Sequence, residues 1–108
     1  MTLKGLFKMS LFNLNQPDNL KAILHNPKYS GKDNYGKLRE IYVHRLFAMT
    51  DSQLEEECEK VIWLSAYANN NPKSDYHWQA DACYDVARSR DKISQIYEKA
   101  YNNASKRK

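Results

Sequence analysis

The stretch from Thr50 to Pro72 constrains this fold more than any other part of the chain. It begins with TDSQ, the spacing of a capping box, in which Thr50 and Gln53 bond each other's backbone N–H groups. Acidic residues crowd the next turns, where the helix dipole favours negative charge. Small and apolar side chains then recur at helical spacing, at Leu54, Cys58, Val61, Ile62, Ser65 and Ala68. The sequence predicts a helix over 51–68, and Pro72 separates it from the next element.

A second helix is predicted directly after the proline, over 74–88. Ser74 is a good N-cap for it. The polar run RSRDK, residues 88–92, then predicts a break or bend before an apolar pattern that continues toward Ala100. We expect the helices over 51–68 and 74–88 to form an antiparallel hairpin. Cys58 and Cys83 would then meet in its interface as buried, reduced thiols.

Shorter helices are predicted in the N-terminal half. Apolar spacing indicates helices over 3–14, 19–26 and 35–49, and the glycine-containing segment 28–36 is expected to be a loop. The apolar face of the third of these helices is predicted to consist of Leu38, Ile41, Tyr42, Leu46 and Met49. No segment alternates with period two over the length of a strand. The predicted fold is all-α, a small bundle of four to six helices built around the hairpin.

Length and hydropathy narrow the class of protein. A chain of 108 residues is expected to form one domain, here residues 1–108 with a frayed basic tail at 102–108. No apolar run approaches the ~20 residues of a membrane-spanning helix. The N-terminus alternates apolar and polar residues too often for the core of a signal peptide. We therefore expect a cytoplasmic protein without a membrane partner.

The charges are distributed in three blocks. Residues 1–49 carry 8 basic and 3 acidic side chains, residues 50–85 carry 2 basic and 8 acidic, and residues 86–108 carry 7 basic and 2 acidic. Basic ends thus flank an acidic middle. Either the blocks balance each other within the molecule, or the basic ends meet an acidic partner or phosphates.

The region around residue 80 holds the side chains most suited to catalysis or metal binding, yet no catalytic or metal site is predicted there. His77, Asp81 and Asp85 share one helical face, but a metal needs three or four ligands and the other histidines lie in segments with no matching ligand pair. Nothing local activates Cys83 as a nucleophile, since no glycine-rich elbow precedes it. We expect no cofactor, no metal and no enzymatic activity.

Aromatic residues gather where the predicted hairpin turns. One pair lies near the end of the first helix and another opens the second, so the turn would bring them to one end of the molecule. Buried, they would close the core; partly exposed, they would form a contact patch for a protein partner. The predicted contact residues are Trp63, Tyr67, Tyr76, His77 and Trp78, with charged contacts from Arg88 and Arg90. Alanine at positions 76 and 78 is expected to abolish binding with helicity retained.

The stretch WLSAYANNNPKSDYHWQADACYD, residues 63–85, resembles part of small uncharacterised accessory proteins of phages and prophages of enteric bacteria. The resemblance implies a small, helical, non-enzymatic protein that binds a host protein in the bacterial cytoplasm and inhibits or redirects it. A bacterial defence system is one such target. No catalytic motif accompanies the resemblance.

Two alternatives stay open at this point. The basic residues Arg88, Arg90 and Lys92, with the tail, are suited to a nucleic-acid-binding accessory protein, because phosphates need only a basic patch. A helix-turn-helix is not indicated, since the turn at 69–74 is long, lacks glycine and contains proline. An exposed apolar face on the helix over 3–14 could also serve a homodimer.

Overall fold

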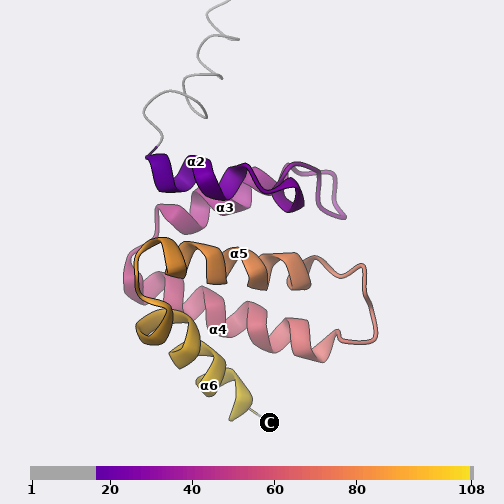
Figure 1. Cartoon of the computed structure of the whole chain (residues 1–108). Helices are drawn as coiled ribbons and strands as arrows, with labels where there is room; N and C mark the ends of the chain where they lie inside the picture. Colours follow the sequence, from indigo (N-terminus) through magenta and orange to yellow (C-terminus); the bar gives the residue numbers. More distant parts are fainter. Residues whose placement is uncertain (1–16, 108) are drawn as a thin grey trace, which may run out of the picture.

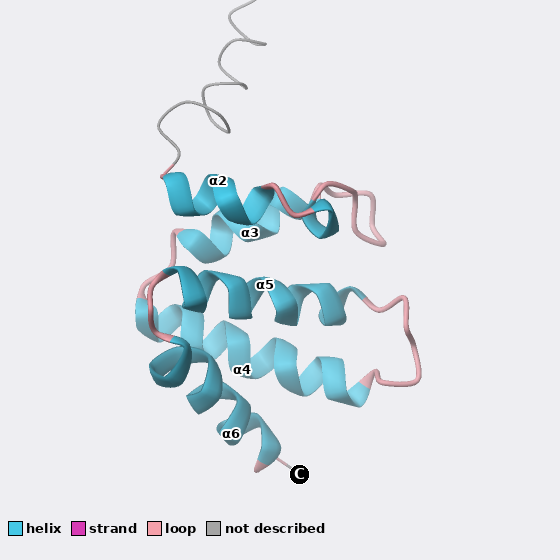
Figure 2. Cartoon of the chain, in the orientation of Figure 1, coloured by secondary structure: helices cyan, strands magenta, loops and turns pink. Residues whose placement is uncertain are grey.

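The computed structural model describes residues 17–107, and their regular structure is helical apart from one isolated bridge between Lys32 and Leu38 (Figures 1 and 2). The predicted all-α fold of four to six helices is confirmed. The helix expected over 3–14 lies outside the described residues. The elements are α2 (Asp18–Leu24), the 3-10 turn η1 (Pro27–Tyr29), α3 (Arg39–Phe47), α4 (Asp51–Tyr67), α5 (Asp75–Ser89), the π-helical turn η2 (Ile93–Glu98) and α6 (Lys99–Ser105).

The helices stack in layers, and α4 and α5 occupy the middle (Figure 1). α5 packs against α2 and α3 on one side, while α4 packs against α6 on the other. α4 and α5 also pack against each other along their length and are joined by the loop 68–74. That loop lies at the same end of the molecule as the loop before α3. The turns after α3 and α5 lie at the opposite end (Figure 1).

Local capping fixes where the two central helices begin. The Thr50 Oγ1 accepts the backbone N–H of Gln53, and the Gln53 Oε1 accepts that of Thr50, so the predicted capping box is present. The Ser74 hydroxyl accepts the N–H of Tyr76 at the start of α5. The break predicted at 88–92 is confirmed: α5 ends at Ser89, and Asp91 has a positive φ of 56°. A side-chain-bearing residue in this left-handed conformation cannot continue a right-handed helix.

The core lies where α4 meets α5. Leu54, Cys58, Val61 and Ile62 of α4 are buried as predicted. Both cysteines are fully buried and neither forms a disulfide. A side-chain hydrogen bond with the Cys58 thiol, together with burial, raises the pKa of Cys83 well above its ordinary value. A thiol kept protonated in this way is a weak nucleophile, so the pair packs as small apolar groups.

The apolar face predicted for α3 is wrong in part. The helix begins at Arg39 rather than at residue 35, because residues 33–37 form a hydrogen-bonded turn. Val43 and Leu46 are buried, whereas Ile41 is 50% exposed. Tyr42 faces α5 from this helix, and its ring packs edge-on against Trp78, with centroids 5.5 Å apart.

Tyr29 is a core residue that the sequence pattern did not identify. It lies in the segment expected to be a loop, yet it is buried, and its hydroxyl donates to Asp85 Oδ2 at 2.6 Å. Burial and this hydrogen bond raise the pKa of the Tyr29 hydroxyl. The bond links η1 to α5 across 56 residues and holds the start of the loop against the helix layer.

The C-terminal residues are more ordered than we expected. α6 extends through Ser105 and so includes part of the segment predicted to fray, because Ala104 is buried in the core. Between residues 17 and 107, no helix combines the length and the apolar character needed to cross a membrane.

Candidate functional site

The acidic middle of the chain and its basic C-terminal part neutralise each other within the molecule. Four ion pairs join α4 to the segment after α5: Arg90 and Lys92 with Asp51, Lys99 with Glu55, and Arg107 with Glu59. Arg88 lies 3.9 Å from Asp85 on its own helix. The interpretation of the charge blocks as an intramolecular balance is therefore confirmed for these residues.

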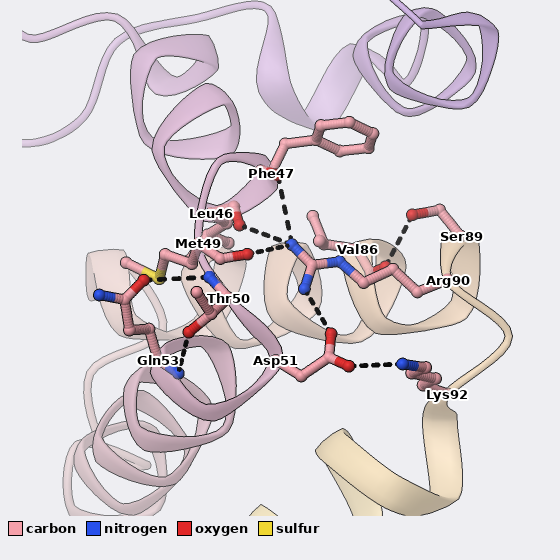
Figure 3. Close-up of polar contacts among 10 residues, drawn as sticks. All are labelled: Leu46, Phe47, Met49, Thr50, Asp51, Gln53, Val86, Ser89, Arg90 and Lys92. Atoms are coloured by element: carbon pink, nitrogen blue, oxygen red, sulfur yellow. Dashed lines mark hydrogen bonds and ion pairs between the residues drawn. The ribbon is translucent and has the colours of Figure 1, made fainter.

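Arg90 joins the ends of three helices, as Figure 3 shows. Its guanidinium donates to Asp51 Oδ1 at 2.7 Å and to the carbonyl oxygens of Leu46, Phe47 and Met49 at 3.3, 3.2 and 2.8 Å. These carbonyls lie at the end of α3, where helix carbonyl groups lack intrahelical partners. That of Leu46 also accepts the backbone N–H of Met49. The Arg90 side chain is only 18% exposed. Arg90, which the sequence assigned to a partner contact, thus has polar contacts within the molecule itself.

The charges around Asp51 make stability depend on pH. Hydrogen bonds from Lys92 and then Arg90 hold the pKa of the Asp51 carboxyl below its ordinary value. A carboxyl whose pKa is lowered by folding contributes its full stabilisation above the pKa of the unfolded chain, about 4. The contribution is lost as the pH falls through the lower pKa of the folded state. We expect the urea midpoint to fall with pH in this acidic range, and to fall less steeply in Asp51→Asn.

Urea unfolding followed by circular dichroism at a series of acidic pH values would measure this difference. Wild type and Asp51→Asn should converge at the lowest pH, where both side chains at position 51 are neutral. A difference between them that is the same at every pH would contradict the proposed contribution of the ionised carboxylate.

The structure does not assemble the predicted aromatic residues into one patch. Trp78 is buried, at 6% exposure, and faces α3 and η1. Its ring meets Tyr42 and Tyr29 edge-on, its Nε1 donates to Asp75 Oδ1 at 3.0 Å, and the Arg39 guanidinium lies over it at 4.9 Å. Trp78 is thus a core residue, and we remove it from the predicted contact set.

Trp63 and Tyr67 lie on a separate face of the molecule, on the last turns of α4. Their rings stack with centroids 5.4 Å apart, and Arg107, beyond α6, covers Trp63 at 5.5 Å. Trp63 is therefore partly covered from the C-terminal side. Tyr67 stays 79% exposed at the end of the helix, next to the loop 68–74.

His77 has an internal role as well. Its Nε2 lies 2.8 Å from the carbonyl oxygen of Asn71, which can only accept, so this nitrogen carries the proton. Its Nδ1 lies 2.6 Å from Ser65 Oγ, so both ring nitrogens are engaged. The imidazole thereby ties the loop 68–74 to α4. Within residues 17–107 no three potential ligands cluster around a metal position, and Asp81 and Asp85 bond Lys28 and Tyr29 instead.

The turn at 33–37 presents an aromatic side chain that the sequence pattern did not single out. The Asp33 carboxylate accepts the backbone N–H groups of Tyr35 and Lys37 at 2.8 and 2.9 Å. Both hydrogen bonds hold the pKa of the Asp33 carboxyl below its ordinary value, and the bond from the Lys37 N–H has the larger effect. Gly36 completes the turn with a φ of 81°, a conformation that a side chain would strain. Tyr35 projects from this turn and is 85% exposed.

Two further residues hold the turn against the rest of the molecule. The Asn34 amide donates to the carbonyl oxygen of Lys73 at 2.8 Å, and its backbone N–H donates to the Asp75 carboxylate. On the other side, Arg39 donates to the carbonyl oxygens of Lys28 and Lys32. The turn is therefore bonded to the N-terminus of α5 and, through the Arg39 guanidinium over Trp78, to the core.

These contacts create one surface from two loops that are distant in sequence. Asn34 touches residues 73 and 75, so their neighbours come together there. We use the name tyrosine–lysine surface for the exposed tyrosines and lysines of these two joined segments, which are Tyr35, Tyr76, Lys32, Lys37 and Lys73. Tyr76 is the member that was predicted, and it is 37% exposed. The signal for the others is the run DNYG, an aspartate with a glycine three residues on, which favours a tight turn.

We compared the chain with protein-family models, with curated proteins and with solved structures, and none of them matched.

Proposed function

We propose that this chain is a small non-enzymatic binding protein of phage or prophage origin that binds a host protein and inhibits or redirects it. A bacterial defence system is a target of this kind. The observation that carries the proposal is the exposure of Tyr35 on a turn held by hydrogen bonds. Asn34 bonds this turn to the start of α5, the segment that carries the partly exposed Tyr76. The resemblance of residues 63–85 to phage accessory proteins supports the proposed origin.

A contact surface binds more tightly when it loses little conformational entropy on binding. A tyrosine ring offers a large apolar area and one polar group with only two side-chain torsions, which suits the centre of a protein interface. A flexible loop would lose conformational entropy on binding, which weakens affinity. Here hydrogen bonds of Asp33 and Asn34 already hold the backbone around Tyr35, so a partner would meet a turn whose backbone is preorganised.

The alternative, a nucleic-acid-binding protein that uses the basic C-terminal region, has less support. Arg88, Arg90, Lys92, Lys99 and Arg107 each lie within ion-pair distance of an acidic side chain. Phosphates would have to compete with these carboxylates for the same cations. The lysines beside Tyr35 are not held in this way by any carboxylate of residues 17–107.

A capture experiment tests the proposed contact. Tagged wild-type protein should retain a host protein from nuclease-treated lysate of enteric bacteria. The double variant Tyr35→Ala/Tyr76→Ala should bind the purified host protein at least about 30-fold more weakly, the loss expected when interface residues worth ~2 kcal/mol are removed. Calorimetry or surface plasmon resonance would measure the affinities.

Tyr84→Ala is the matched control, because Tyr84 is as exposed as Tyr76, at 37%, and lies eight residues further along α5, outside the two loops. It should bind like wild type, and the melting temperatures of all variants should confirm that they are folded. Unchanged affinity in the double variant would reject this surface as the contact. Capture that depends on nucleic acid would favour the alternative.

A further inference from the structure

The lysines of the tyrosine–lysine surface differ from most other cations of the described chain. Lys32, Lys37 and Lys73 are exposed, and none of them has an acidic side chain within ion-pair distance among residues 17–107. Eight other basic side chains of this region do. The two carboxylates in the same place, Asp33 and Asp75, accept backbone and indole N–H groups of their own loops.

We infer that the partner presents a carboxylate-rich protein face to the tyrosine–lysine surface. This inference rests on the proposed function and adds the chemistry of the partner. Acidic side chains of the partner would form ion pairs with the three ammonium groups, and Tyr35, on the turn that ends at Lys37, would contribute an apolar contact. Complementary charge of this kind directs encounter and orientation more than it adds affinity.

A protein face fits this surface better than a single-stranded nucleic acid. Proteins that bind single strands stack successive bases on several aromatic rings along a continuous basic groove. The tyrosine–lysine surface has one fully projecting ring, since Tyr76 is only 37% exposed. The carboxylates of Asp33 and Asp75 also interrupt the lysines, and a continuous phosphate backbone would have to pass both. Separate acidic side chains can be spaced to avoid them.

The lysines can be tested with a defined probe. The full-length, 15N-labelled protein would be titrated with a short peptide rich in aspartate and glutamate, and separately with oligothymidylate of the same length. The peptide should shift the amide signals of residues 32–37 and 73–76. In Lys32→Gln/Lys73→Gln its affinity should fall about tenfold, and added salt should weaken wild-type binding because it screens exposed charges.

The matched control is Lys21→Gln/Lys106→Gln, which removes the same charge from exposed lysines on α2 and just after α6 that also have no ion pair within residues 17–107. It should leave the local shifts unchanged. Shifts spread over the whole molecule, an equal loss in both double variants, or tighter binding of oligothymidylate would each overturn the inference.

The same variants separate the inference from the proposed function. Suppose that Tyr35→Ala/Tyr76→Ala releases the captured host protein but Lys32→Gln/Lys73→Gln binds it like wild type. The tyrosine–lysine surface then contacts the host protein, and the inference that this protein presents a carboxylate-rich face is wrong. If the tyrosine variant binds it fully, the proposed contact itself fails.

Discussion

Replacing Trp78 with alanine should lower the free energy of unfolding by about 3–5 kcal/mol, the range for removing a large aromatic side chain from a core. The indole is buried between η1, α3 and α5, where it contacts the rings of Tyr29 and Tyr42. Its removal would leave a cavity and would deprive the Asp75 carboxylate of the indole N–H. Thermal unfolding followed by circular dichroism should show a melting temperature lower by at least about 10 °C.

The neighbouring variant Tyr76→Ala is the control for this prediction. Tyr76 lies two residues away on the same first turns of α5 but is partly exposed, so its loss should change stability by less than about 1 kcal/mol. Comparable destabilisation by the two changes would contradict the different burial of the two side chains. A Trp78→Ala protein of wild-type stability would show that the indole is not a core residue.

Replacing Arg90 with methionine should lower the free energy of unfolding by about 2–4 kcal/mol, because hydrogen bonds to a charged group are stronger than neutral ones. The change removes one bond to Asp51 and three to the carbonyl oxygens at the end of α3. Methionine has a similar length, so the loss reports the polar contacts more than the packing. Urea denaturation at neutral pH would measure it.

Two further variants make this prediction specific. Arg90→Lys should recover only part of the loss, since one ammonium group cannot reach the carbonyls and the carboxylate in the fork geometry of a guanidinium. Lys92→Gln removes the other cation on Asp51, but at a side chain that is 45% exposed, and should cost no more than about 1 kcal/mol. A full rescue by lysine, or an equal loss in Lys92→Gln, would argue that simple charge attraction explains the effect.

The helices whose limits were predicted best are those with local signals. Thr50 and Gln53 cap each other within one turn, and Ser74 caps the helix that starts beside it. The start of α3 was missed because the competing turn at 33–37 is stabilised partly by Asn34, whose partners lie about 40 residues away. A local pattern of apolar residues contains no information about such a contact.

The candidate site likewise combines features that local sequence indicates with features that depend on contacts between distant segments. Sequence alone brought attention to the aromatic residues near the hairpin turn, but it could not distinguish Trp78, which is buried, from Tyr76, which is partly exposed. It also assigned Arg90 to a partner, because the carbonyl oxygens that it binds belong to residues more than 40 positions earlier. Tyr35 was not singled out, since its neighbours indicated only a loop.

By itself the sequence determined the all-α class, the caps of α4 and α5 and the two buried cysteines, and it marked residues 88–92 as the place of a break or a bend without deciding between the two. These features depend on backbone hydrogen bonds and side-chain spacing within a few residues, so they can be predicted from short stretches. Only the tertiary structure decided which aromatic rings are core and which cations are already neutralised. Burial and ion pairing depend on groups that the fold brings together from distant segments, and the exposed surface is what remains when those contacts are complete.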